Sequence, residues 1–252
     1  MELSLVLVVA VSLLAVSPTE AATGHLPKSY PLCKKSDPNL NTCLKNAVQA
    51  VVPQLVDGIP NLGVLSIDPL EVSSIDISQG TGPVAVALKF RNVKVYGLSK
   101  GIVRDSKADL KNFMLEFGGF APYVRLEADY EMDGKILVLP VTGKGRCNIT
   151  FDDMETRLGP KGKSTKKNGD SYFDVTDFKL DIFSLGKLSF NFENLFNGDK
   201  TLGESMNKIM NENWKDMWAE LRPSFEKTFS AVFREYAHRL FSKVPMKDIF
   251  LD

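Results

Sequence analysis

Histidine and net charge are what this chain has least of. Its 252 residues include two histidines, His25 and His238, and its 31 basic side chains equal its 31 acidic ones. A chain without net charge has no overall field to attract nucleic acid, so we expect no nucleic-acid partner. The histidines and the scattered carboxylates lack the spacing of a metal site. We therefore expect no metal, no cofactor and no catalytic residues.

Residues 1–21 have the pattern of a secretory signal peptide. The apolar run from Leu3 to Val16 is shorter than the roughly 20 residues that a membrane span needs. Pro18 ends the run, and small residues near Ala21 suit cleavage, although Glu2 stands where a basic residue is usual. We predict that residues 1–21 are removed and that residues 22–252 form a secreted, extracellular domain.

Cysteine is scarce too, and secretion decides how the three cysteines are interpreted. Cys33 and Cys43 lie close together after the predicted signal peptide, where an oxidising compartment favours a disulfide between them. A loop this short gains roughly 2–3 kcal/mol of stability from such a bond. Cys147 is left over, either as a buried free thiol or as an intermolecular partner. Residues 148–150 form a glycosylation sequon, so Asn148 is a candidate N-glycosylation site.

The longest periodic segment runs from Leu202 to Phe241. Its apolar residues recur at helical spacing, with charged residues on the opposite side. As one helix it would span roughly 60 Å at ~1.5 Å per residue, which exceeds the width of a compact chain of this size. The charges along the segment exclude a membrane span. Pro223 removes one backbone donor, so we predict a kink between Leu221 and Phe225.

Alternating apolar residues between Glu71 and Asn194 predict a series of β-strands. Residues 84–90 alternate cleanly, and Val93 and Val95 then continue one residue out of phase. Such phase breaks are where β-bulges bend and twist a strand. Asp133-Gly134 predicts a hairpin turn, and the basic segment 161–169 predicts a solvated hairpin tip.

Short connections between these strands favour an antiparallel meander. Repeated bulges would curl the sheet, and its apolar face would cover the C-terminal helix. The expected fold class is therefore α+β: an elongated single domain in which a long C-terminal α-helix is wrapped by a strongly curved antiparallel β-sheet.

Several short motifs follow one another along the chain. They are the pair Cys33 and Cys43, then GIPNLG at 58–63, IDPL at 67–70, NVKVYGLS at 92–99, YEMDGKI at 130–136, NLFNG at 194–198 and VPMKDIF at 244–250. No single motif is specific. The ordered set covers the whole mature chain and resembles the takeout and haemolymph juvenile-hormone-binding proteins of insects.

The resemblance implies a fold of the tubular lipid-binding type, with an apolar tunnel between helix and sheet that holds one small hydrophobic molecule. It implies a carrier, secreted into haemolymph or tissue fluid, of a juvenile-hormone-like terpenoid, a fatty acid or a related lipid. Members of the takeout branch are tied to circadian output, feeding and chemosensation. Cys147 has no visible partner where juvenile-hormone carriers have a second disulfide, which favours the takeout branch. Leu65 stands where many members have a proline.

The expected ligand contacts combine the helix with the inner face of the sheet. They are Met206, Met210, Trp214, Met217, Leu221 and Phe225 on the helix, and Val86, Phe90 and Tyr130 on the strands. Plain core packing is the alternative for each helix residue. Tyr130 is the candidate polar group, because its strand phase points it inward. Its buried hydroxyl would need a partner, which is a ligand oxygen, a backbone carbonyl or a buried water.

Two other functions are alternatives. A lipid-transfer or protein-interaction role, with contact to a membrane or receptor, would use the tunnel as a slot for lipid chains. A serine esterase would use residues 97–101, which match the G-x-S-x-G pattern around Ser99, together with His238. That motif needs a parallel strand before it and a helix after it, whereas antiparallel strands are predicted on both sides. We therefore expect a monomeric carrier that is not an enzyme.

Overall fold

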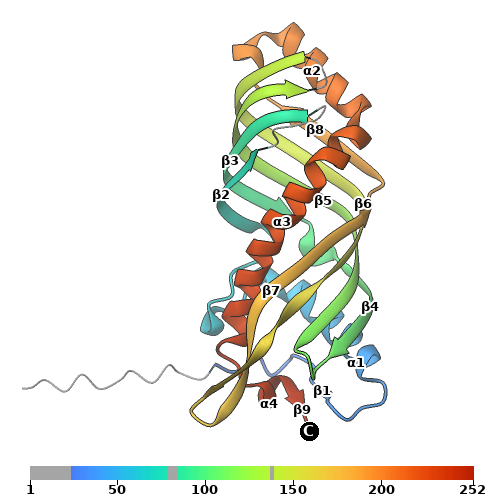
Figure 1. Cartoon of the computed structure of the whole chain (residues 1–252), viewed down its shortest axis with the longest axis vertical. Helices are drawn as coiled ribbons and strands as arrows, with labels where there is room; N and C mark the ends of the chain where they lie inside the picture. The colour runs from blue at the N-terminus through green and yellow to red at the C-terminus, as the bar shows by residue number, and fades with distance from the viewer. Residues whose placement is uncertain (1–23, 79–83, 137–138) are drawn as a thin grey trace, which may run out of the picture.

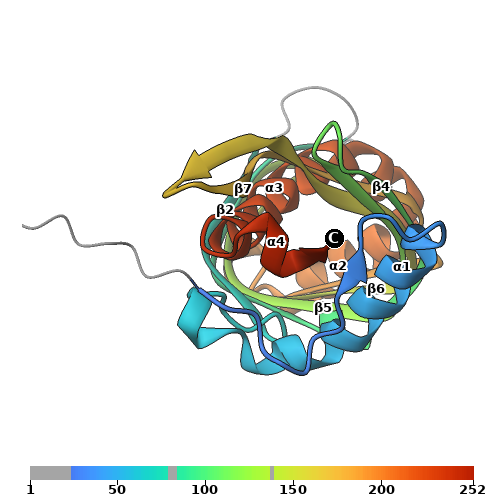
Figure 2. The ribbon, with the colours of Figure 1, turned by 90° about the horizontal axis from the view of Figure 1, so that it is seen from below.

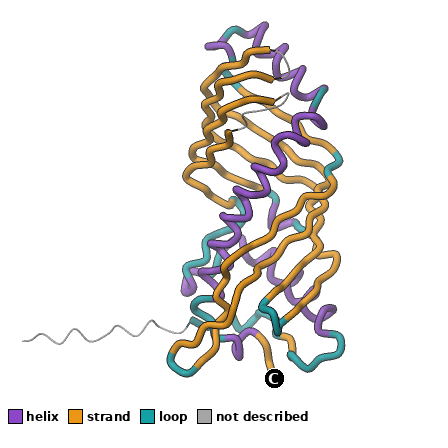
Figure 3. The backbone as a smooth tube through the Cα atoms, in the orientation of Figure 1, coloured by secondary structure: helices purple, strands orange, loops and turns teal. Residues whose placement is uncertain are grey.

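The computed structural model describes residues 24–78, 84–136 and 139–252, and the predicted signal peptide lies outside these residues. The described chain forms an elongated body in which a curved antiparallel sheet runs beside a long helix (Figure 1). Helix and sheet extend along the same axis, and much of the loop structure gathers at the lower end (Figure 3). This confirms the predicted α+β architecture with a single domain.

Two long strands form the spine of the seven-stranded sheet. The strands of this sheet are β2 (Leu70–Ser78), β3 (Val84–Tyr96), β4 (Ile102–Asp109), β5 (Met114–Ile136), β6 (Leu139–Lys167), β7 (Asp170–Ser184) and β8 (Lys187–Phe192). β5 and β6 pair with each other, and each carries two shorter strands along its other side. β3 and β4 both pair with β5, whereas β7 and β8 both pair with β6. The sheet therefore ends at β2 and β4 on one side and at β7 and β8 on the other.

Bulges lie in several of the strands. In β3 the register with β5 shifts between Arg91 and Lys94, and Asn92 between them has a φ of 53°. This confirms the phase break that the sequence shows after Phe90. Further shifts occur between Glu155 and Thr156 and between Lys161 and Gly162 in β6. Because each bulge bends its strand, the sheet curls around its apolar face.

Two turns that the sequence predicts do not lie at the predicted residues. Asp133 and Gly134 lie within β5, where they pair with Thr142 and Val141 of β6, so the chain does not reverse there as predicted. Residues 137–138, between the two strands, lie outside the described residues. A side chain at Gly134 would collide with the backbone of β3, so the glycine serves strand packing there. The basic segment 161–169 is mostly strand, because β6 continues to Lys167. The turn itself is Asn168-Gly169, with positive φ at both residues, as a tight hairpin requires.

The C-terminal helical segment is interrupted, but not where its proline lies. It forms α2 (Lys200–Glu212) and α3 (Trp214–Phe241), separated at Asn213, which has φ −106° and ψ 26°. Pro223 lies inside α3. The prediction of one continuous helix is therefore wrong, since it is interrupted at Asn213, ten residues before Pro223. The kink predicted between Leu221 and Phe225 stays a prediction.

The lower end of the molecule is tied together by both ends of the chain. The remaining helices are α1 (Leu40–Val51), α4 (Met246–Ile249), and the short 3-10 helices η1 (Val52–Asp57), η2 (Pro60–Leu62), η3 (Leu98–Lys100) and η4 (Phe196–Gly198). β1 (Cys33–Lys34) pairs in parallel with β9 (Phe250–Leu251). Seen from below, α4 and the C-terminus lie across this end of the curled sheet (Figure 2).

The cysteines follow the predicted pairing. Cys33 and Cys43 form a disulfide that joins β1 to α1. Cys147 is a free thiol and is buried in β6. Of its two sequence-based interpretations, the structure therefore favours a buried free thiol.

Candidate functional site: an apolar cavity beneath the helices

A cavity lies between the helices and the concave face of the upper half of the sheet. Among the described residues, nineteen side chains line it, and all of them are apolar: Ile75, Ile77, Val86, Leu88, Phe90, Leu126, Met132, Ile136, Ile149, Phe151, Leu188, Phe190, Phe192, Met210, Met217, Trp218, Leu221, Phe225 and Phe229. The volume of this cavity is about 40 Å³. Since small-molecule sites usually have roughly 300–1,000 Å³, these side chains nearly close the cavity.

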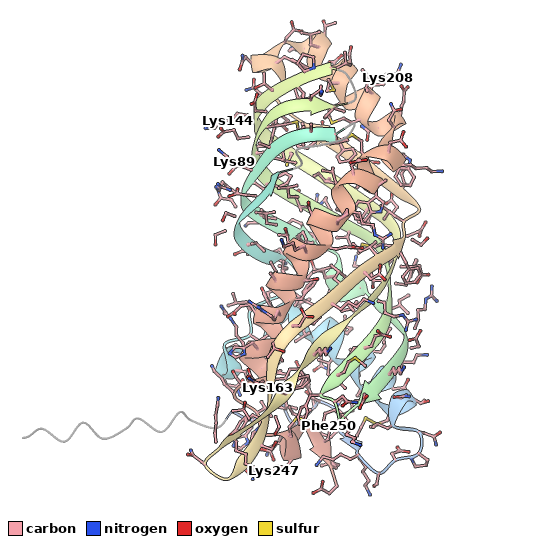
Figure 4. The ribbon with its side chains drawn as sticks, in the orientation of Figure 1. Lys89, Lys144, Lys163, Lys208, Lys247 and Phe250 are labelled. Atoms are coloured by element: carbon pink, nitrogen blue, oxygen red, sulfur yellow. A yellow bond between two sulfur atoms is a disulfide. The ribbon has the colours of Figure 1, made fainter. Side chains whose placement is uncertain are left out.

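Strand geometry explains the apolar wall. Successive side chains of a strand point to opposite faces, so Val86, Leu88 and Phe90 of β3 are buried while Lys89 between them is exposed. Figure 4 shows Lys89 and Lys144 pointing away from the body of the ribbon. The same alternation runs through β5, β6 and β8. The inner face is therefore apolar and the outer face is charged.

Aromatic rings fill much of the space between α3 and the sheet. The ring of Phe225 lies 5.1 Å from that of Phe151 on β6 and 4.4 Å from that of Phe229 on the next helical turn, between ring centroids. Trp218 packs edge-on against both Phe151 and Phe225, at 6.0 and 5.7 Å. Trp218 and Phe229 were absent from the predicted contacts. The signal for Phe229 was available, because it lies four residues after Phe225.

Six of the nine predicted contact residues line this cavity and three do not. Val86, Phe90, Met210, Met217, Leu221 and Phe225 are brought together. Met206 is buried one helical turn before Met210 but lies outside the lining. Trp214 comes directly after the interruption at Asn213, and its ring lies 5.7 Å from the Lys215 ammonium. The break at Asn213 ends the regular helical spacing on which its prediction depended.

Tyr130 also lies outside the lining. Its hydroxyl donates to the backbone carbonyl of Glu193 at 2.6 Å, and its ring packs edge-on against Phe192 at 4.7 Å. Burial raises the pKa of the Tyr130 hydroxyl well above its ordinary value. The structure therefore gives the hydroxyl the backbone partner that was the alternative to a ligand oxygen.

Along one side the helices hold the sheet through side chains that take the place of a strand. Asn207 and Asn211 of α2 each bond both the N–H and the carbonyl of one β8 residue, Phe192 and Phe190 respectively, at 2.7–2.9 Å. Glu226 and Ser230 of α3 accept from the N–H groups of Ile182 and Leu180 in β7, at 2.7 and 3.2 Å. We call this set of contacts the polar seam.

The spacing of the polar seam follows from elementary geometry. Four helical residues rise about 6 Å, and two strand residues rise about 6.6–6.8 Å. Side chains at i and i+4 of a helix can therefore reach alternate residues of a neighbouring strand. The helices thus satisfy edge backbone groups that would otherwise remain unpaired. These groups belong to Leu180 and Ile182 of β7 and to Phe190 and Phe192 of β8.

A second hollow, of about 760 Å³, is lined by residues of β5, β6, β7 and α3. Exposed charged residues are prominent in its lining: Lys161, Asp177, Lys179, Lys227 and Arg234. A site for an apolar molecule needs mostly apolar walls. The cavity beneath the helices is therefore the better candidate.

The hydroxyl of Ser99 has a structural partner. Ser99 lies in η3 between β3 and β4, and its Oγ donates to the carboxylate of Asp68. The backbone N–H groups of Gly97 and Ser99 donate to the same carboxylate. Ser99 therefore helps to hold this loop against the segment before β2. His238, the proposed base, is an exposed residue in the last turn of α3.

Asn148 lies in the middle of the sheet. It pairs with Glu127 of β5 on one side and Asn191 of β8 on the other. Its side-chain oxygen is buried and has no hydrogen-bond partner among the described residues. Glycosylation of Asn148 stays a prediction.

Two further features concern metals and membranes. Within the part of the chain that the structure describes, no cluster of three His, Cys, Asp or Glu side chains could hold a metal ion. Among the helices of residues 24–78, 84–136 and 139–252, none has the length and apolarity to span a bilayer.

The chain has relatives of known name along nearly its whole length. The family model for the haemolymph juvenile hormone binding proteins matches residues 5–251. The circadian clock-controlled protein daywake of Drosophila yakuba is 27% identical over 242 residues, which cover 91% of this chain and 90% of that protein. Its namesake in Drosophila melanogaster is 26% identical over 240 residues, with the same coverage.

A solved structure shares the fold. The crystal structure of Takeout 1 from Epiphyas postvittana matches with a TM-score of 0.75 at 24% identity, covering 88% of this chain and all of that one. Since the family model spans nearly the full sequence and the fold agrees, the chain belongs to the haemolymph juvenile hormone binding protein family.

Proposed function

We propose that this protein is a secreted, monomeric carrier that binds one small hydrophobic ligand in the cavity beneath α2 and α3. The observation that supports this most is the lining itself, in which all nineteen described side chains are apolar. The family membership supports it independently. The proposed contacts are Val86, Phe90, Met210, Met217, Leu221 and Phe225, with Trp218 and Phe229 added from the structure.

The lining favours a lipid without many polar groups. Each 100 Å² of apolar ligand surface removed from water contributes about 2.5 kcal/mol. A juvenile-hormone-like terpenoid, a fatty acid chain or a related lipid would gain from such burial. The flexible side chains of Met210 and Met217 can change shape, so we expect the nearly closed cavity to widen around its ligand. A link to circadian output, as named for the daywake relatives, is part of the proposal.

We propose no hydrolytic role for Ser99. Its hydroxyl bonds to Asp68, in a loop that continues into the antiparallel strand β4. A nucleophile elbow instead leads from its serine into a helix.

The experiment that tests this proposal identifies the molecule that the purified protein carries. The chain is expressed with its own first 21 residues in insect cells, purified from the medium, extracted with organic solvent and analysed by mass spectrometry. A discrete terpenoid or fatty acid in roughly equimolar amount is the expected result. Stoichiometric phospholipid would favour transfer of lipids at a membrane surface. Protein retained inside the cells, or an extract without any lipid from a protein that also binds none when titrated, would contradict the proposal.

A further inference from the structure

The helices are attached to the two sides of the sheet in different ways. On the side of β7 and β8, the polar seam joins Asn207, Asn211, Glu226 and Ser230 to the backbone of the two strands. The ion pair of Arg222 with Asp181 of β7 adds to it. In Figure 1, β7 and β2 lie on opposite sides of α3.

On the β2 side the contact beside the cavity is apolar. Ile75 and Ile77 of β2 line the cavity together with α3, and Val72 packs against the same core. Two hydrogen bonds of α3 end below β2, where Tyr236 donates to the carbonyl of Ser66 and Arg239 to that of Gly63.

The charged residues of β2 are used within the sheet. Glu71 pairs with Lys94, and Asp76 pairs with Arg91, both on the neighbouring strand β3. They therefore fasten β2 to β3 and not to the helix. β2 and β3 are thus joined by two ion pairs in addition to their antiparallel backbone pairing.

These two attachments respond differently to an apolar ligand. Opening the polar seam would strip partners from backbone N–H groups of β7 and from N–H and carbonyl groups of β8. An apolar molecule cannot replace those bonds. Opening the β2 side exposes apolar surfaces, which the passing ligand itself covers. An apolar ligand thus lowers the free-energy cost of opening the β2 side, but it does not lower the cost of opening the polar seam.

From this we propose that the ligand enters and leaves the cavity sideways, between β2 and α3, while the polar seam stays closed as the hinge side. The proposal rests on the carrier function proposed above. It goes further by assigning the moving edge to β2 and the fixed edge to β7 and β8.

The experiment links each edge covalently to the helix. For the β2 side, Ser74→Cys is combined with Thr228→Cys. Burial and, to a lesser extent, the carboxylate of Glu71 raise the pKa of the Tyr236 hydroxyl, so Glu71 and Tyr236 lie near each other. Thr228 is eight helical residues from Tyr236, about 12 Å, and Ser74 is three strand residues from Glu71, about 10 Å, so the two positions lie at a similar height.

The matched control links the other side. Lys179→Cys of β7 is combined with Lys227→Cys of α3, two exposed positions that line the same hollow. Both double variants are treated with the same short, flexible bis-maleimide. Cys147 is left in place, because burial raises the pKa of its thiol to about 12 and only the thiolate reacts readily.

Uptake and release of the fluorescent probe N-phenyl-1-naphthylamine are followed by stopped flow before and after linking. We expect the β2 link to slow both rates by about tenfold or more, with little change in the dissociation constant. The control link should leave the rates of uptake and release within about twofold of their values before linking. Unchanged rates in the β2-linked protein, or equal slowing in the control, would overturn the proposal.

Hydrogen exchange gives a second measurement that needs no ligand. In the unlinked protein, the amides of Phe190 and Phe192, which donate to Asn211 and Asn207, should exchange as slowly as the amides that bond β8 to β6, since the seam stays closed. Exchange of these two amides about tenfold faster than the β6-bonded ones would show that the seam opens and would refute the assignment of the fixed edge. If the unlinked protein takes up no lipid or probe, the carrier function fails, and hydrogen exchange still tests whether the seam stays closed.

Discussion

Replacing Asn211 by alanine tests whether the polar seam holds the helices to the sheet. The Asn211 side chain accepts from the N–H of Phe190 at 2.7 Å and donates to its carbonyl at 2.8 Å. Alanine removes both bonds and leaves two backbone groups of β8 without their partner. Phe190 is only 6% exposed, so water has little access to take over these bonds.

The expected loss follows from those two groups. An unpaired buried donor or acceptor costs roughly 1–3 kcal/mol, and the half-buried position of Asn211 favours the lower end of that range. Alanine returns roughly 0.5 kcal/mol through its better helix propensity. We therefore expect the free energy of unfolding to fall by about 1.5–2.5 kcal/mol, which corresponds to a decrease in Tm of roughly 3–10 °C for a chain of this size.

The assay is urea denaturation followed by circular dichroism, with Lys208→Ala as the matched control on the same helix. Lys208 is 74% exposed and makes only a 3.9 Å ion pair with Glu212, so its removal should change stability by less than about 0.5 kcal/mol. If Asn211→Ala is as stable as the Lys208→Ala control, the seam contributes little and the reasoning is refuted.

Three further predictions concern single side chains. Tyr130→Phe should lower the free energy of unfolding by about 1–2 kcal/mol, because the Glu193 carbonyl loses its donor. Ligand affinity should stay unchanged, and a tenfold weaker affinity with an unchanged melting temperature would place the hydroxyl at the ligand. Cys33→Ser should cost roughly 2–3 kcal/mol in urea denaturation, since it opens the short loop to Cys43, and a loss below about 1 kcal/mol would contradict this. Burial raises the pKa of the Cys147 thiol from 9.0 to about 12. Above pH 9 the unfolded chain therefore releases a proton that the folded protein keeps, and stability should decline from pH 9 towards 12. Stability measured against pH should fall less steeply in Cys147→Ala, and equal slopes in the two proteins would show that the thiol is not the cause.

Much of the fold could be predicted because its signals are local. Alternation along residues 84–90 places one face of β3 inward, and the break after Phe90 marks a real bulge. The pairing of Cys33 with Cys43 followed from the predicted secretion and the short spacing. In each case the deciding information lies within a few residues of the chain.

The polar seam could not be predicted in this way. In the sequence, Asn207 and Asn211 look like solvent-facing residues of an amphipathic helix. Their role depends on where the edge of β8 lies, and that position is set by the pairing of β8 with β6. The same dependence on the rest of the fold explains Asp133-Gly134, a strong local turn signal that lies within β5 because Gly134 permits close approach of β3.

The interruption of the C-terminal helix decides which of the predicted helix residues line the cavity. One regular helix would have placed Met206, Met210, Trp214 and Met217 along one stripe. The interruption at Asn213 divides this stripe, so that Met210 and Met217 line the cavity and Trp214 does not. Nothing in the local sequence favours Asn213 over Pro223 as the place of that break.

The central claim is that the ligand binds in the cavity beneath α2 and α3. A substitution that fills this cavity from one wall tests it most directly. Met210 lines the cavity and is fully buried, whereas Met206, one turn earlier on α2, is buried outside it. Met210→Trp and Met206→Trp add the same bulk to the same helix, and thermal melts would confirm that both variants are folded at the assay temperature. In titrations with N-phenyl-1-naphthylamine, Met210→Trp should bind at least about tenfold more weakly than the unsubstituted protein, or ~1.4 kcal/mol, while Met206→Trp binds equally well. A folded Met210→Trp protein with unchanged affinity would show that the ligand lies elsewhere.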